Sequence, residues 1–241
     1  MILPSRPTRA RTRVVLTGFG PFPGVPVNAT MLLVPRLGVA ARQLFPALDI
    51  TTEILATEWI AAPARVDTLI AEHAPELLIH FGVSGAARGF EIEQHGHNTR
   101  DATLDAGGRL PHAAHVRADG ANVHLARLPV AAIVARLREH GIPAFLSPNA
   151  GAYLCNATLY HSLAVSDPVM CDAGFVHIPA SLAPPGPVAK GAPLQASPGC
   201  PLTWPQALEG ALHILAVCLG KPSRPTQVTA ELLARLSLTS S

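Results

Sequence analysis

Short runs of apolar and β-branched residues, most of them closed by glycine or proline, recur along the chain. Residues 13–18, 76–82 and 174–179 have this form and predict buried strands. Residues 48–55 are rich in Ile and Thr, and the apolar residues 144–147 follow a helical stretch, so each predicts a further strand.

Between these runs, apolar residues recur at helical spacing. The predicted helices cover residues 29–43, 61–73, 129–140, 153–163 and 204–219. Asn28 is expected to cap the first helix, and Ser147 or Asn149 to cap the helix that contains Cys155. Because strands alternate with helices, we expect an α/β fold, a single three-layer α/β/α domain with a twisted, mostly parallel (mixed) sheet.

The remaining segments lack periodicity and define the expected domain organisation. Residues 84–120, rich in Gly, His and Asp, and the proline-rich residues 181–201 are predicted to be loops. We expect a basic, flexible N-terminal arm over 1–12, an α/β domain over 13–220, and a C-terminal extension over 221–241 with a short helix at 226–236.

Composition excludes several classes of protein. The 241 residues are 49% hydrophobic and 14% charged, which is incompatible with a disordered chain. The net charge is only +2 and four of the basic residues, all arginines, crowd the N-terminus, so we expect no nucleic-acid partner. No apolar run approaches the roughly 18 residues of a membrane span, so we expect no membrane partner. The four cysteines lack C-x-x-C spacing and predict a reduced, cytoplasmic protein.

One cysteine lies where a helix start would activate it. Cys155 is expected in the first turn, where the partial positive charge of unpaired N–H groups favours a thiolate. A buried packing cysteine is the alternative. The segment Ala150-Gly151-Ala152-Tyr153-Leu154-Cys155-Asn156 resembles the nucleophile segment of the pyroglutamyl peptidase I (pyrrolidone-carboxylate peptidase) family of cysteine exopeptidases.

Three further segments resemble the same family, in its order and spacing. They are Thr17-Gly18-Phe19-Gly20-Pro21-Phe22-Pro23-Gly24 followed by Asn28, the stretch from Gly82 through Glu93 to Asn98, and Gly174-Phe175-Val176-His177-Ile178-Pro179. The resemblance implies that Cys155 is the nucleophile, His177 the base and Glu93 the carboxylate that orients it. Counting forward from Gly82 and back from Asn98 selects Glu93 rather than Glu91.

The resemblance also implies a substrate and the residues that bind it. The family removes N-terminal pyroglutamate, so the partners would be peptides with a blocked N-terminus. Phe19 and Phe22 would sandwich the pyrrolidone ring, with Asn28, Val83 and Tyr153 as further substrate-binding residues. No cofactor is implied, and the family suggests a homodimer or homotetramer.

This sequence departs from the family pattern near the substrate. Val83 replaces a glutamine that helps recognise the lactam, and Gln94 replaces an arginine. The arginine credited with helping the oxyanion is replaced by Thr103, with Arg100 three places early. An amidase or peptidase for a related cyclic or acyl group, and a non-catalytic binding protein on the same scaffold, therefore stay open as alternatives.

Two alternative kinds of site, one for a dinucleotide and one for a metal ion, fit the sequence less well. Gly18-Phe19-Gly20 follows a strand, as in a dinucleotide-binding loop, but Pro23 replaces the third glycine and no acidic residue follows about 20 positions on. His95 and His97, with Glu93, His112 and His115, offer metal ligands. The H-E-x-x-H spacing is absent, so we expect no metal.

Overall fold

The computed structural model describes residues 11–185 and 193–221. The predicted helix 226–236, and most of the predicted arm and extension, lie outside the described residues, so the predicted domain boundaries stay predictions. The strands of the main sheet are β1 (Thr12–Phe19), β2 (Leu48–Leu55), β3 (Leu77–Ser84), β4 (Phe90–Glu93), β7 (Ala144–Ser147) and β8 (Asp172–Pro179). The helices are α1 (Ala29–Leu44), α2 (Ala61–His73), α3 (Val130–Glu139), α4 (Leu154–Val165) and α5 (Trp204–Cys218), with a single 3₁₀ turn η1 (Ala180–Leu182).

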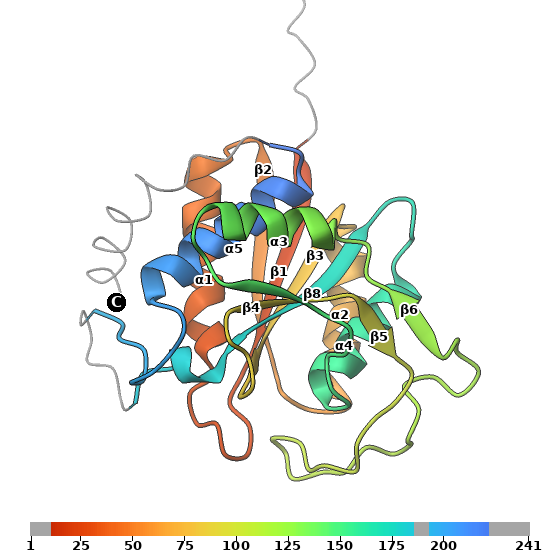
Figure 1. Cartoon of the computed structure of the whole chain (residues 1–241). Coiled ribbons are helices and arrows are strands. Elements are labelled where there is room, and N and C mark those ends of the chain that lie inside the picture. Colours follow the sequence, from red (N-terminus) through yellow and green to blue (C-terminus); the bar gives the residue numbers. More distant parts are fainter. Residues whose placement is uncertain (1–10, 186–192, 222–241) are drawn as a thin grey trace, which may run out of the picture.

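The six-stranded sheet is mixed, as predicted. Its strand order is β2-β1-β3-β8-β4-β7, and the first four strands run parallel to one another. β4 pairs with β8 in the antiparallel direction and with β7 in the parallel direction. A small two-stranded ribbon, β5 (His95–His97) with β6 (Val123–Leu125), lies beside α4 (Figure 1).

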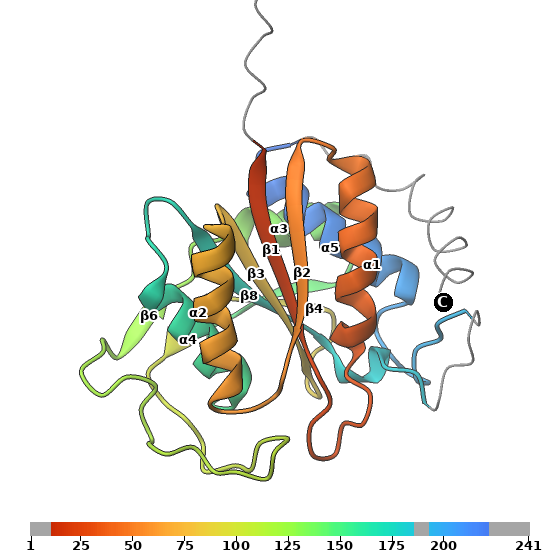
Figure 2. The same ribbon diagram turned by 180° about the vertical axis from the view of Figure 1, so that it is seen from behind.

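Helices cover both faces of the sheet, which explains the continuous apolar runs. One core cluster joins α1, α3 and α5 to one face, and a second joins α2 and α4 to the other. Figures 1 and 2 show these two groups of helices on opposite sides of the strands. Neighbouring residues of β1 serve both clusters, since Val14 and Leu16 face the first and Val15 faces the second. The fold class predicted from sequence is confirmed.

The predicted loop over 84–120 is partly wrong. It contains β4 and β5, and only its later part, from about 98 onward, lacks regular structure. β4 alternates apolar and acidic residues in the sequence Phe-Glu-Ile-Glu, and Phe90 and Ile92 are fully buried. This strand was not predicted because it has only four residues and neither of its glutamates is exposed, since Glu91 is half-buried and Glu93 is buried.

Of the two predicted helix caps, that of α1 is confirmed and that of α4 is wrong. The side chain of Asn28 accepts a hydrogen bond from the Thr30 N–H and caps α1, as predicted. Neither Ser147 nor Asn149 caps α4, whose N-cap is Tyr153, and the Tyr153 side chain makes no capping hydrogen bond. Asn149 instead accepts from the N–H of Gly151, whose φ of +82° turns the chain before the helix can start.

Candidate active site

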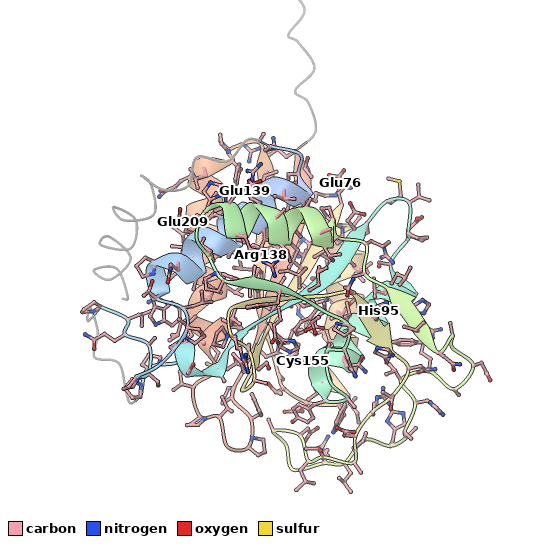
Figure 3. The ribbon with its side chains drawn as sticks, in the orientation of Figure 1. Glu76, His95, Arg138, Glu139, Cys155 and Glu209 are labelled. Carbon is pink, nitrogen blue, oxygen red and sulfur yellow. The ribbon has the colours of Figure 1, made fainter. Side chains whose placement is uncertain are left out.

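Cys155 is the second residue of α4, and its thiol is half-buried. The turn through Gly151 delivers the chain from β7 to this helix start, where the first N–H groups have no partner within the helix. The positive end of the helix dipole lies at this position, and the Cys155 N–H is available to a developing negative charge. Figure 3 shows Cys155 near the start of α4.

His177 and Glu93 meet because β8 and β4 are neighbours in the sheet. The Nδ1 atom of His177 lies 2.8 Å from Oε1 of Glu93, and both side chains are buried. His177 is also hydrogen bonded to Cys155, which leaves its Nε2 as the atom that faces the thiol. The structure thus brings the three predicted residues into one chain of contacts, thiol to imidazole to carboxylate.

The electrostatics of this chain favour a charged imidazole. Burial by itself would lower the pKa of His177, but the negative charge and hydrogen bond of Cys155, together with those of Glu93, raise that pKa to about 10. A sulfur nucleophile, an imidazole and an orienting carboxylate are the groups that nucleophilic acyl transfer requires.

A cavity of about 620 Å³ opens over the thiol at the carboxyl ends of β1, β3 and β8. All five residues predicted to bind substrate, and the three predicted catalytic residues, line it. The predicted residues are Phe19, Phe22, Asn28, Val83, Tyr153, Glu93, Cys155 and His177. Parallel strands place such crevices at their carboxyl ends, which explains the location.

Aromatic side chains form one side of this cavity. The rings of Phe22 and Tyr153 lie 5.9 Å apart, and Trp59 packs edge-on against Tyr153 at 5.2 Å. Phe19 is only 2% exposed and packs against Phe175, so it belongs to the core although a Gly- and Pro-rich loop follows it. It ends β1 and forms a wall of the cavity from within the core.

Asn28 has a structural task at the same place. Its Oδ1 accepts from Thr30, and its Nδ2 donates to the carbonyl of Gly20. The hydroxyl of Thr57 donates to the same carbonyl at 2.9 Å. Asn28 therefore borders the cavity while holding the loop that carries Phe22.

The structure adds residues that sequence reasoning missed or set aside. A Cβ atom on Gly82 would lie 3.0 Å from the Cys155 sulfur and 2.6 Å from the Phe175 ring, so glycine lets the strand approach the thiol. Glu91, set aside in favour of Glu93, also lines the cavity, as do Ser147 and Asn149. Gly82 and Glu91 carried a sequence signal, because Gly82 opens the motif that runs to Asn98 and Glu91 alternates with Glu93.

Arg100 does not take the place of the family's arginine. Its two terminal nitrogens donate to the carbonyls of His115 and Val116, and it does not line the cavity. At position 103 the backbone carbonyl accepts from the Trp59 indole. No lysine or arginine lines the cavity in the part of the chain that the structure describes.

The histidine-rich segment does not gather into the alternative metal site. His95 and His97 both contact the carbonyl of Pro148, at 3.1 and 3.2 Å, and His115 contacts the Asn98 carbonyl. Within residues 11–185 and 193–221, the one group of metal-ligating side chains is Glu91, Glu93 and His177, which belongs to the site described above.

Comparisons with known proteins agree with this geometry. The family model described as pyroglutamyl peptidase matches residues 12–191. A pyrrolidone-carboxylate peptidase from Gloeobacter violaceus is 36% identical over 69% of this chain and 81% of its own length. One from Oceanobacillus iheyensis is 30% identical over 70% of this chain and 84% of its own.

Solved structures show the same likeness. Pyroglutamyl peptidase I from Bacillus amyloliquefaciens superposes with a TM-score of 0.73 at 24% identity, covering 87% of this chain and 98% of its own. A mutant pyrrolidone carboxyl peptidase from Pyrococcus furiosus gives 0.70 at 26% identity, covering 87% and 99%. The family match, the relatives and the shared fold together show that this chain belongs to the pyroglutamyl peptidase family of cysteine peptidases.

Proposed function

We propose that this protein hydrolyses the amide bond that follows an N-terminal pyroglutamyl residue, with Cys155 as nucleophile, His177 as general base and acid, and Glu93 as the carboxylate that orients His177. The observation that carries the proposal is the contact chain from Cys155 through His177 to Glu93, which lines an aromatic-walled cavity. The relatives named above are pyrrolidone-carboxylate peptidases, which supports the substrate class and does not favour a related amidase or a non-catalytic binding protein.

The geometry supports a two-step reaction. The Cys155 thiolate attacks the pyroglutamyl carbonyl carbon, and the resulting oxyanion meets the Cys155 N–H at the start of α4. His177 then gives its Nε2 proton to the leaving amine, the C–N bond breaks, and a thioester remains on Cys155. Water, deprotonated by His177, attacks the thioester and releases pyroglutamate, which restores the thiol and imidazole pair.

The acyl pocket is the part of the cavity bordered by β1, β3 and the start of α4. There the flat lactam would lie among Phe19, Phe22, Val83 and Tyr153, and Asn28 would keep the Phe22 loop in place. Apolar contacts would supply most of the binding, since Val83 offers no hydrogen bond to the lactam.

The test is release of a fluorescent amine from a pyroglutamyl amide by the full-length protein. We expect turnover by the natural protein, loss of turnover in Cys155→Ala, and retention in Cys200→Ala, whose half-buried thiol is not in the cavity. Absence of release by the natural protein under reducing conditions would overturn the proposed function.

Two wider properties complete the proposal. We infer a homodimer or homotetramer, supported by the exposure of Leu125 on β6 and of Phe145 and Leu146 on the edge strand β7, at 67%, 40% and 43%. Light scattering coupled to size exclusion measures the oligomeric state directly.

We also place the protein in the reducing cytoplasm, because all four cysteines are free and Cys155 must remain a thiol. No helix of the described residues is long and apolar enough to cross a membrane.

A further inference from the structure

A second carboxylate borders the site beside the one that contacts His177. Glu91 and Glu93 are two residues apart on β4 and therefore project from the same face of the strand. Glu91 is the register partner of His177, and one ligand atom each of Glu91, Glu93 and His177 lie within 4.8 Å of one another. Glu93 is fully buried against the imidazole, whereas Glu91 is half-buried and lines the cavity.

The strand order places Glu91 on one particular side of the reacting bond. The proposed acyl pocket lies over β1 and β3, His177 stands on β8, and Glu91 stands on β4, which follows β8 in the sheet. His177 delivers its proton to the leaving amine, so the leaving residue must lie beside the imidazole, away from Phe22 and Val83. Ser147, at the end of β7, continues the cavity in the same direction.

No lysine or arginine of the described residues lies beside Glu91 in the cavity. The ionisable groups that line the cavity are Glu91, Glu93, Tyr153, Cys155 and His177, and neither a lysine nor an arginine is among them. Glu93 is fully buried against His177, so Glu91 is the carboxylate of the two that remains open to the cavity. No ion pair joins Glu91 to a lysine or arginine in the described part of the chain.

We propose that Glu91 is a specificity-determining residue, which favours substrates whose leaving residue, the one directly after pyroglutamate, carries a cationic side chain. This inference rests on the proposed function and assigns the leaving-group side of the same site. A lysine or arginine side chain there gains an opposite charge in a half-enclosed space, and an acidic side chain meets repulsion from two carboxylates.

The peptide experiment compares kcat/KM for three pyroglutamyl dipeptide amides whose second residue is lysine, norleucine or glutamate. Norleucine matches the lysine stem without its charge. We expect the natural protein to prefer lysine over norleucine by about fivefold, the upper range for a partly solvated charge pair, and to disfavour glutamate. In Glu91→Gln the lysine-to-norleucine ratio should fall to about one.

The matched control is Glu139→Gln. Glu139 is an exposed glutamate at the end of α3, well apart from Cys155 in Figure 3, and it does not line the cavity. It should keep the lysine-to-norleucine ratio of the natural protein. A ratio near one in the natural protein, or a ratio that survives Glu91→Gln, overturns the proposal. So does a Glu91→Gln variant that slows all three substrates equally, because that result makes Glu91 a positioning residue.

The pH dependence of the same ratio offers an internal check. Burial raises the pKa of Glu91, His177 acts against that rise and Glu93 adds to it, and Cys155 and Tyr153 are the other ionisable groups of the cavity. Because both substrates share Cys155, His177 and Glu93, titration of these groups cancels in the ratio. The lysine preference should vanish as pH falls through the pKa of Glu91, and a preference that persists there contradicts the assignment.

A second arm needs no peptide cleavage. Methanethiosulfonate reagents transfer a thioalkyl group to a thiolate, forming a disulfide and releasing methanesulfinate. The rate ratio of a trimethylammonium-ethyl reagent to a sulfonatoethyl reagent at Cys155 should fall about fivefold or more in Glu91→Gln and stay constant in Glu139→Gln. An unchanged ratio overturns the role of Glu91. If no pyroglutamyl peptide is cleaved, the proposed function fails, while this arm still decides whether Glu91 selects charge at the thiol.

Discussion

At the scale of single residues, two glutamates on one short strand have different surroundings. Glu93 is fully buried and reaches Nδ1 of His177, while Glu91 remains open to the cavity. Spacing relative to Gly82 and Asn98 singles out Glu93, and the hydrogen bond falls on that residue. Spacing could not reveal that Glu91 would also lie beside His177, because this depends on the pairing of β4 with β8.

Replacement of Glu93 tests its orienting role. Glu93→Gln keeps the shape and a hydrogen-bond acceptor but removes the charge that stabilises imidazolium. We expect kcat for a pyroglutamyl amide to fall by about 10-fold to 10⁴-fold, the upper value by analogy with the serine triad. Steady-state kinetics measure the change, with Glu139→Gln as control and circular dichroism to verify folding. Retention of full kcat would remove Glu93 from the mechanism.

Val83 is the departure from the family pattern with the most direct consequence. It is half-buried and lines the cavity. Val83→Gln supplies a hydrogen bond to the lactam, which contributes about 0.5–1.5 kcal/mol. We expect kcat/KM for pyroglutamyl amides to rise about tenfold, measured beside prolyl amides on both proteins. A flat or lower pyroglutamyl rate, with a natural preference for prolyl amides, would mean that the pocket is shaped for another group.

At the scale of secondary-structure elements, Asn156 joins the nucleophile helix to the segment after Glu93. Its Oδ1 accepts from the N–H of His97, and its Nδ2 donates to the carbonyls of His97 and Thr99. The side chain is fully buried between α4 and β5. One residue beside Cys155 thus fixes the position of the chain that leaves Glu93.

Removal of this amide should be costly. Asn156→Ala leaves the N–H of His97 and the carbonyl of Thr99 without the partner that the amide supplies, at about 1–3 kcal/mol for each group that water cannot reach, while the carbonyl of His97 keeps the N–H of Thr99. We expect the free energy of unfolding to fall by about 2–5 kcal/mol in urea titrations. Gln43→Ala, on the exposed face of α1, should stay within about 0.5 kcal/mol of the natural protein. Equal stability of the two variants would refute the stabilising role of the Asn156 side chain.

The elements themselves were predicted to different degrees. Strands such as β3 are buried on both faces, so their continuous apolar runs predicted them. The helices between them were predicted from apolar residues at helical spacing. β4 was missed because half of its side chains are glutamates held inside the protein. The prediction of an Asn149 cap for α4 was wrong because the turn at Gly151 separates Asn149 from the helix. Local sequence carried no sign of that turn's geometry.

At the scale of the whole molecule, a polar histidine side chain is buried inside the core. His80 on β3 is fully buried between Thr17 and Ser162, with ring nitrogens 2.6 and 2.8 Å from their hydroxyl oxygens. Burial, followed by the charge of His161, lowers the pKa of His80 to about 3. His80 therefore stays neutral in the folded protein at pH values where the unfolded chain protonates it.

This difference predicts how stability depends on pH. Above the unfolded pKa of about 6.5, His80 has no effect, and as pH falls below it the unfolded state gains a proton that the folded state refuses. The free energy of unfolding should drop by about 2 kcal/mol between pH 7 and pH 5 through this residue. His80→Gln should flatten that drop, and the surface variant His73→Gln should not. Parallel curves for all three proteins would contradict the account.

The arrangement of the whole molecule was predicted only in outline. Alternation of strands and helices indicated a three-layer mixed sheet, and four motifs indicated which residues would meet. The strand order and the antiparallel entry of β4 rest on contacts between residues far apart in the chain, such as Ile92 with Val176. The extent of the cavity, and the presence of Glu91 in it, follow from that order.

The most direct test of the central claim labels the thiols with iodoacetamide while pyroglutamyl-amide activity is followed. Burial raises the pKa of Cys171 to about 11 and that of Cys218 to about 12, so both should react slowly. Peptide mapping by mass spectrometry should show Cys155 alkylated first, with activity lost in proportion to its labelling. Activity that persists after Cys155 is fully alkylated, or that falls with another cysteine, would contradict the account.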